Sequence, residues 1–132
     1  FQLKQYIEQT QNDLFADRQL RLMIENGNRQ VVGIVDLCSF DPLHNRAEVG
    51  IMVDKSCRRQ GIGRNALALL EEHCFRYLGI HQLFAYIAVE NLPSRRLFAA
   101  CGYKESAVLK EWAHTFGGGY TDVLVVQKLN LS

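Results

Sequence analysis

Strong charge of either sign is missing from this chain of 132 residues. Its 15 Lys and Arg nearly cancel its 14 Asp and Glu, which leaves a net charge of +1. The basic residues are scattered except around Arg58 and Arg95, so the pattern argues against bulk electrostatic binding of nucleic acid. A local basic pocket for one small ligand fits this pattern better.

Long apolar runs and metal-binding motifs are missing as well. No apolar run approaches the length that spans a bilayer, and no charged-then-apolar signal segment opens the chain. The four cysteines form no C-x-x-C pair and no cluster with histidine: Cys38, Cys57, Cys74 and Cys101. They are typical of reduced thiols. We therefore expect a cytoplasmic protein that contacts no membrane and holds no metal.

With 48% hydrophobic residues and no repeat or linker, the chain is expected to form one domain over residues 1–132. Apolar spacing predicts helices over 1–15, 66–75 and 94–101, and strands over 20–25, 30–40, 47–53, 83–89, 103–112 and 120–129. This order predicts an α/β fold with a mixed sheet, antiparallel early and parallel where helices cross over. The apolar run Leu83–Val89 is typical of a buried, parallel strand.

The stretch Ala47–Leu70 organises the rest, because it runs from a strand through a glycine turn into a helix. A helix start offers unpaired backbone N–H groups and a partial positive charge, so a phosphate can bind there. Gly61 and Gly63 allow close approach of the backbone, and the neighbouring arginines suit phosphate geometry. A lone G-x-G is a weak signal, however. The chain matches neither the P-loop nor the dinucleotide fingerprint, so the turn alone leaves a structural role equally open.

Two motifs together resemble the GNAT superfamily of acyl-CoA-dependent N-acetyltransferases. Arg58-x-x-Gly61-x-Gly63 matches the family's pyrophosphate motif, and Asn91-x-x-Ser94-x-x-Leu97-Phe98-x-x-x-Gly102-Tyr103 matches its second motif in the right order. The resemblance is to the branch of spermidine and ribosomal-protein N-acetyltransferases. It implies a mostly antiparallel sheet with helices on both faces and a splayed parallel pair, Val49–Val53 and Leu83–Val89. It also implies that the first strand and helix of such a domain precede Phe1.

The resemblance implies acetyl-CoA as co-substrate and assigns its binding residues. The pyrophosphate would bind the turn formed by Arg58, Arg59, Gln60, Gly61, Ile62, Gly63 and Arg64. The backbone of Ile51 and Val53 would bind the pantetheine amides, and an N–H near Ile51 or Met52 would stabilise the oxyanion. Asn91 and Ser94 are candidates for hydrogen bonds to the cofactor. A loop role for Asn91 and a helix-cap role for Ser94 stay open.

Glu48 is the candidate base, because relatives in this branch carry a glutamate at the start of the central strand. A primary amine with a pKa of about 10.4 is mostly protonated at neutral pH, so a base assists attack. The alternative is that Glu48 pairs with a surface arginine such as Arg46. Many relatives place a tyrosine at Phe98 to protonate the leaving thiolate, and phenylalanine has no proton to give. Tyr103 is the candidate substitute, although it also fits a packing role, and Tyr120 is a weaker one.

The sequence therefore predicts an N-acetyltransferase that moves an acetyl group from acetyl-CoA directly to a primary amine. The acceptor stays open between a polyamine, a small amine and a protein N-terminus or peptide, and a homo-oligomer is possible. The alternative, motivated by Phe98, is a non-catalytic acyl-CoA-binding or regulatory module.

Overall fold

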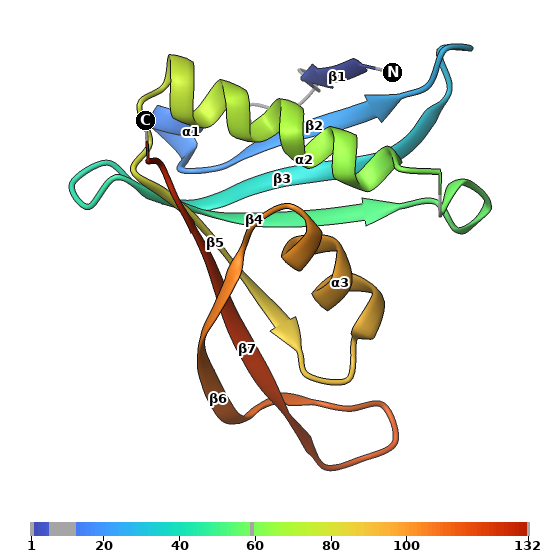
Figure 1. Cartoon of the computed structure of the whole chain (residues 1–132), viewed down its shortest axis with the longest axis vertical. Helices are drawn as coiled ribbons and strands as arrows, with labels where there is room; N and C mark the ends of the chain where they lie inside the picture. Colours follow the sequence, from blue (N-terminus) through green and yellow to red (C-terminus); the bar gives the residue numbers. More distant parts are fainter. Residues whose placement is uncertain (1, 6–12, 59, 132) are drawn as a thin grey trace.

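The computed structural model describes residues 2–5, 13–58 and 60–131 (Figure 1). Its helices are α1 (Leu14–Asp17), α2 (Ile62–Glu72) and α3 (Leu92–Ala100), with a short 3-10 turn at Lys55–Cys57 and a π-helical extension of α2 at His73–Tyr77. Its strands are β1 (Gln2–Gln5), β2 (Leu20–Glu25), β3 (Val31–Asp41), β4 (Arg46–Val53), β5 (Gln82–Ala88), β6 (Lys104–His114) and β7 (Tyr120–Leu129).

The predicted helix over residues 1–15 is wrong. Gln2–Gln5 form β1, which pairs antiparallel with β2, and α1 is a single turn over Leu14–Asp17. The Asp13 side chain caps this turn by accepting from the N–H groups of Phe15 and Ala16, and Arg18 ends it in the left-handed region. The rest of the predicted helix, residues 6–12, lies outside the described residues. Strand pairing with β2 overrides the local apolar spacing at Gln2–Gln5.

The strands form one seven-stranded sheet in the order β1-β2-β3-β4-β5-β7-β6. Among the described strands, β4 and β5 are the parallel pair, and the other neighbours are antiparallel. Their register covers only Arg46–Glu48 of β4 and Gln82–Phe84 of β5. Beyond Glu48 and Phe84 the two strands diverge, and α3 lies beside the opening (Figure 1). The predicted mixed α/β fold, its antiparallel majority and its splayed parallel pair are confirmed.

One face of the sheet packs against α2 and α3. Alternate residues of β4 and β5, Ala47, Val49, Leu83, Ala85 and Ile87, form one core cluster with Leu67 and Leu70 of α2 and Phe98 of α3. The intervening residues Glu48, Phe84 and Tyr86 point to the opposite face, which we call the open face. Helices were expected on both faces. In the described part of the chain, α2 and α3 share one face.

A charged pair crosses the core side and connects three elements. Glu71 of α2 is 5% exposed, and its carboxylate accepts a hydrogen bond from the Lys128 ammonium of β7. Lys128 also donates to the Cys101 carbonyl oxygen, at the end of α3, over 2.6 Å. The pKa of Glu71 is raised because burial disfavours its charged form more than Lys128 favours it. Lys128 therefore holds the C-terminal halves of α2 and α3 against the sheet.

Candidate active site

The divergence of β4 and β5 exposes backbone polar groups along one edge of β4. The Asp54 N–H donates to the Val32 carbonyl of the β3 segment over 2.8 Å, which fixes which edge each peptide group of β4 faces. Because successive residues of a strand direct their N–H and C=O groups to alternate edges, Met52 faces β3 while Ile51 and Val53 face the gap. No β5 residue is in register with Ile51 or Val53. Their peptide groups are therefore placed to bind an extended ligand.

The turn after β4 forms an uncapped helix start at the end of this gap. Gly61 is the N-cap of α2 with φ of 77°, a left-handed conformation that favours glycine, and no side chain caps the first turn. At Gly63 an added Cβ would lie 3.3 Å from Leu97 of α3 and 3.7 Å from Val53 of β4. Gly61 thus provides the left-handed N-cap conformation, and Gly63 allows α2 to pack closely against α3.

Side chains of the same turn are mostly exposed. Arg58 donates from Nε to the Val53 carbonyl oxygen over 3.3 Å, so its guanidinium lies against the end of β4. Gln60 and Arg64 are exposed and Ile62 is half-buried, whereas Arg59 lies outside the described residues. Uncapped N–H groups and nearby guanidinium groups together favour an anion such as a phosphate.

The start of α3 borders the opening from the β5 side. The Asn91 side chain accepts a hydrogen bond from the Ser94 N–H over 3.3 Å, so Asn91 acts as the N-cap of α3. Arg95 binds the Val89 carbonyl oxygen at 2.9 Å and Glu105 at 3.1 Å, which anchors α3 to the end of β5 and to β6. The helix-cap role therefore belongs to Asn91, and the Ser94 backbone is its partner.

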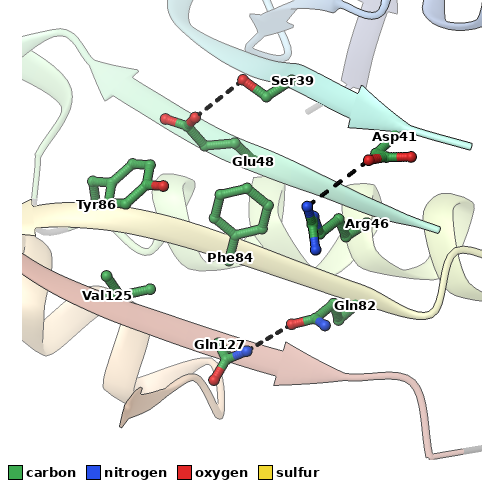
Figure 2. A pocket seen from close by; sticks show the side chains of 9 residues that line it. All are labelled: Ser39, Asp41, Arg46, Glu48, Gln82, Phe84, Tyr86, Val125 and Gln127. Carbon is green, nitrogen blue, oxygen red and sulfur yellow. Dashed lines mark hydrogen bonds and ion pairs between the residues drawn. The ribbon is translucent and has the colours of Figure 1, made fainter. Parts of the chain in front are cut away.

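A cavity of about 390 Å³ lies on the open face (Figure 2). It lies over the paired segment of β4 and β5 up to the point where they separate, and over the end of β3 and over β7. Its lining combines charged, amide and aromatic side chains: Ser39, Asp41, Arg46, Glu48, Gln82, Phe84, Tyr86, Val125 and Gln127. We call this cavity the open-face pocket.

Glu48 stands in this pocket at the last paired position of β4. Its carboxylate accepts a hydrogen bond from the Ser39 hydroxyl at 3.4 Å. The predicted alternative, an ion pair with Arg46, is not formed among the described residues, because Arg46 lies 3.8 Å from Asp41 instead. The Cys38 thiol also interacts with the Glu48 side chain. Glu48 lines the cavity, where it can accept a proton from a bound amine.

The Cys38 thiol lies in the negative electrostatic field of the Glu48 carboxylate. Cys38 lies opposite Glu48 in the β3–β4 register. Burial, together with the nearby carboxylates of Glu48 and Asp36, raises the pKa of this thiol to about 11. The thiol is therefore protonated at neutral pH and does not act as a nucleophile there.

Two aromatic residues of the pocket were missed at the sequence level. The run Leu83–Val89 predicted a strand that is buried throughout, yet Tyr86 is 45% exposed. Its ring lies edge-on to Phe84 with 5.8 Å between centroids. In the structure Leu83, Ala85 and Ile87 are buried, and Phe84 and Tyr86 alternate with them on the open face. Both aromatic rings therefore belong to the site.

Phe98 and Tyr103 lie on the other side of the sheet, in the core. They are 4% and 5% exposed, and their rings meet edge-to-face at 4.9 Å. Within the described part of the chain the Tyr103 hydroxyl has no hydrogen-bond partner. Burial and the nearby Glu71 raise its pKa far above the ordinary value. Tyr103 thus packs in the core and does not line the open-face pocket, so we do not retain it as the proton donor.

No group of three or more His, Cys, Asp or Glu side chains among the described residues is arranged to hold a metal ion. None of the helices in this part of the chain is long and apolar enough to cross a membrane. The four cysteines are free thiols.

Comparison with protein families matches residues 1–104 to the acetyltransferase (GNAT) domain. The spermidine N(1)-acetyltransferase of Vibrio cholerae serotype O1 is 27% identical over 103 residues, covering 78% of this chain and 59% of that protein. The putative phosphinothricin acetyltransferase YwnH of Bacillus subtilis is 34% identical over 102 residues, covering 73% of this chain and 59% of that protein. The chain thus spans less than two thirds of these relatives.

Solved structures of similar fold include spermidine N-acetyltransferases. A dodecameric spermidine N-acetyltransferase from Vibrio cholerae has a TM-score of 0.82 and 25% identity, covering 89% of this chain and 68% of that one. The F149A mutant of that organism's SpeG enzyme gives the same TM-score at 26% identity, covering 89% and 69%.

Proposed function

This chain belongs to the GNAT acetyltransferase domain family, and from that premise we propose that it forms the cofactor-binding part of an acetyl-CoA-dependent N-acetyltransferase. The observation that carries the proposal is that strand β4 connects the candidate base to the candidate cofactor-binding turn. Its start places Glu48 in the open-face pocket, and its end leads through an uncapped glycine turn into α2. A thioester bound along β4 would meet an amine bound beside Glu48.

The residues present fit acetyl-CoA. The α2 N-terminus with Arg58 and Arg64 would hold the pyrophosphate, and the gap-facing peptide groups of Ile51 and Val53 would hold the pantetheine amides. Gly63 allows the start of α2 to pack closely against Leu97 of α3. The Ile51 N–H faces the gap and would stabilise the oxyanion, whereas Met52 directs its peptide groups toward β3. Asn91 and Ser94 would contribute through the position of the α3 start.

The reaction follows from the pocket. The Glu48 carboxylate accepts a proton from the bound ammonium, directly or through water, which frees the amine to attack the acetyl carbonyl. Phe84 and Tyr86 provide aromatic faces that favour a cationic acceptor. The acceptor class is a primary amine: a polyamine, a small amine or a protein N-terminus or peptide.

Assembly and location form part of the same proposal. A homo-oligomer is supported by the dodecameric relative. A cytoplasmic location is supported by the free cysteines. We also propose that residues 1–132 belong to one domain.

Acetyl-CoA affinity tests the cofactor assignment. Titration calorimetry would compare the wild-type protein with the Arg58→Ala/Gly61→Ala double variant. The matched control is Arg76→Ala/Gly79→Ala, because Gly79 has a similar left-handed φ of 65° and Arg76 lies at the other end of the same helix. We expect the first double variant to lose at least tenfold in affinity and the control to bind normally. Equal affinity in all three proteins would overturn the site.

A second function is favoured by one observation: Phe98 and Tyr103 place no hydroxyl in the open-face pocket. A non-catalytic acyl-CoA-binding or regulatory module would bind acetyl-CoA and release no CoA thiol with any amine. Amine-dependent turnover by the wild-type protein would exclude this alternative.

A further inference from the structure

The proposed reaction lacks one component, a proton for the thiolate that leaves. When the C–S bond of the tetrahedral intermediate breaks, its electron pair stays on sulfur, and the product thiol needs a proton. Phe98 cannot supply it, and the Tyr103 hydroxyl is buried on the core side of the sheet. A side-chain donor would therefore come from the open face, and the alternative source of the proton is solvent.

We propose that Tyr86 is this donor, an inference that rests on the proposed acetyltransferase function. Tyr86 lies on β5 two residues beyond Phe84, the last β5 residue in register with β4. It is thus the first open-face side chain of β5 past the point of separation. Of the tyrosines in the described ranges, it is the one that lines the open-face pocket.

The two sides of the gap present complementary groups. Figure 2 shows Glu48 on β4 and Tyr86 on β5 facing the same opening, one from each diverging strand. β5 stays paired with β7 through this region, with Tyr86 opposite Val125. The backbone of Tyr86 is therefore held by β7 where β4 diverges from β5. Edge contact with Phe84 at 5.8 Å fixes the ring further. Within the residues that the structure describes, no hydrogen bond engages the Tyr86 hydroxyl, which leaves its proton available.

The proton balance closes with these two side chains. Glu48 passes the proton from the ammonium to solvent and is again a carboxylate. The neutral amine nitrogen then forms a bond to the acetyl carbon, and its surplus proton passes to Glu48. The C–S bond breaks, and the sulfur takes the Tyr86 hydroxyl proton to give the free thiol. Tyr86 is 45% exposed, so solvent or the protonated Glu48 returns the proton to the phenolate. The products are an N-acetylated amine and CoA.

The test is Tyr86→Phe, which keeps the ring and its contact with Phe84 and removes only the hydroxyl. Tyr77→Phe is the matched control, because Tyr77 is 69% exposed at the end of α2 and lies outside the pocket. Steady-state release of CoA thiol with spermidine, a small amine and a peptide N-terminus would be measured across pH, together with acetyl-CoA affinity by calorimetry.

We expect Tyr86→Phe to lower kcat by about 10²-fold with an acetyl-CoA Kd within twofold of wild type. Tyr77→Phe would match wild type in kcat and in acetyl-CoA affinity. A rise in the amine KM with unchanged kcat would assign Tyr86 to acceptor binding and overturn the proposal. Wild-type turnover that Tyr86→Phe leaves intact would also overturn it, with the proposed function still standing. Absence of wild-type turnover would overturn both the Tyr86 proposal and the proposed acetyltransferase function.

Discussion

Replacing Lys128 by methionine tests how the core holds α2 and α3. The Glu71 side chain is 7% exposed and that of Lys128 is 32% exposed, so the variant leaves a buried carboxylate without its ammonium. Removing one partner of a fully buried pair costs about 3–5 kcal/mol, and we expect about 2–3 kcal/mol here because Lys128 is a third exposed. The loss of the hydrogen bond to the Cys101 carbonyl accounts for about 1 kcal/mol of this.

The loss should depend on pH in a defined direction. Because the pKa of Glu71 is raised in the folded protein, its contribution to stability is present at low pH and is lost as pH rises through the folded pKa. Lys128 opposes that rise, so its removal raises the pKa further. The stability difference between wild type and Lys128→Met should therefore be small near the ordinary glutamate value of 4.5 and largest at pH 8.

Urea unfolding of both proteins at several pH values measures this difference. Lys110→Met is the control, because the Lys110 side chain is 80% exposed in its pair with Asp122, and we expect a much smaller and nearly constant loss. A Lys128→Met penalty that is equal at pH 4.5 and pH 8 would refute the role of the Glu71 charge. A double variant, Glu71→Gln/Lys128→Met, should lose the pH dependence.

Three further changes follow from local geometry. Gly61→Ala should cost about 1–2 kcal/mol of unfolding free energy, measured in urea, because φ of 77° strains any residue with a Cβ. Glu48→Gln should lower the raised pKa of the Cys38 thiol, since one of the nearby negative charges is gone. Alkylation of Cys38 by iodoacetamide at pH 9 should then be faster. An unchanged rate would contradict the effect of the Glu48 charge on Cys38. Asp13→Ala should cost about 1 kcal/mol because two N–H groups of α1 lose their acceptor, and an unchanged urea midpoint would contradict the cap.

Local sequence signals predicted most of the sheet, because its hairpins carry their own turn residues. Asn26 accepts hydrogen bonds from the N–H groups of Asn28 and Gln30, and this turn joins β2 and β3 as expected. The glycine turn before α2 was predicted for the same reason, since Gly61 adopts a left-handed conformation. The error at residues 1–15 has the opposite cause. Gln2–Gln5 are fixed by pairing with β2, which local apolar spacing does not reveal.

The site was less predictable, because its geometry depends on which face of a strand is covered. The run around Phe84 and Tyr86 is almost wholly apolar, and only the packing of α2 and α3 on one face leaves these rings on the other. Tyr103 was a candidate from its distance along the chain to Phe98, yet the turn after α3 places it in the core. The position of Glu48 was predicted correctly at the start of β4, whereas its hydrogen bond to Ser39 was not.

The most direct test of the central claim is the release of CoA thiol from acetyl-CoA in the presence of an amine panel, with the wild-type protein and Glu48→Gln side by side. The account predicts amine-dependent release by wild type and a loss of about 10²-fold in Glu48→Gln, with acetyl-CoA affinity unchanged in both. Tight binding of acetyl-CoA without release for any amine would contradict catalysis, and absence of binding would contradict the cofactor site itself.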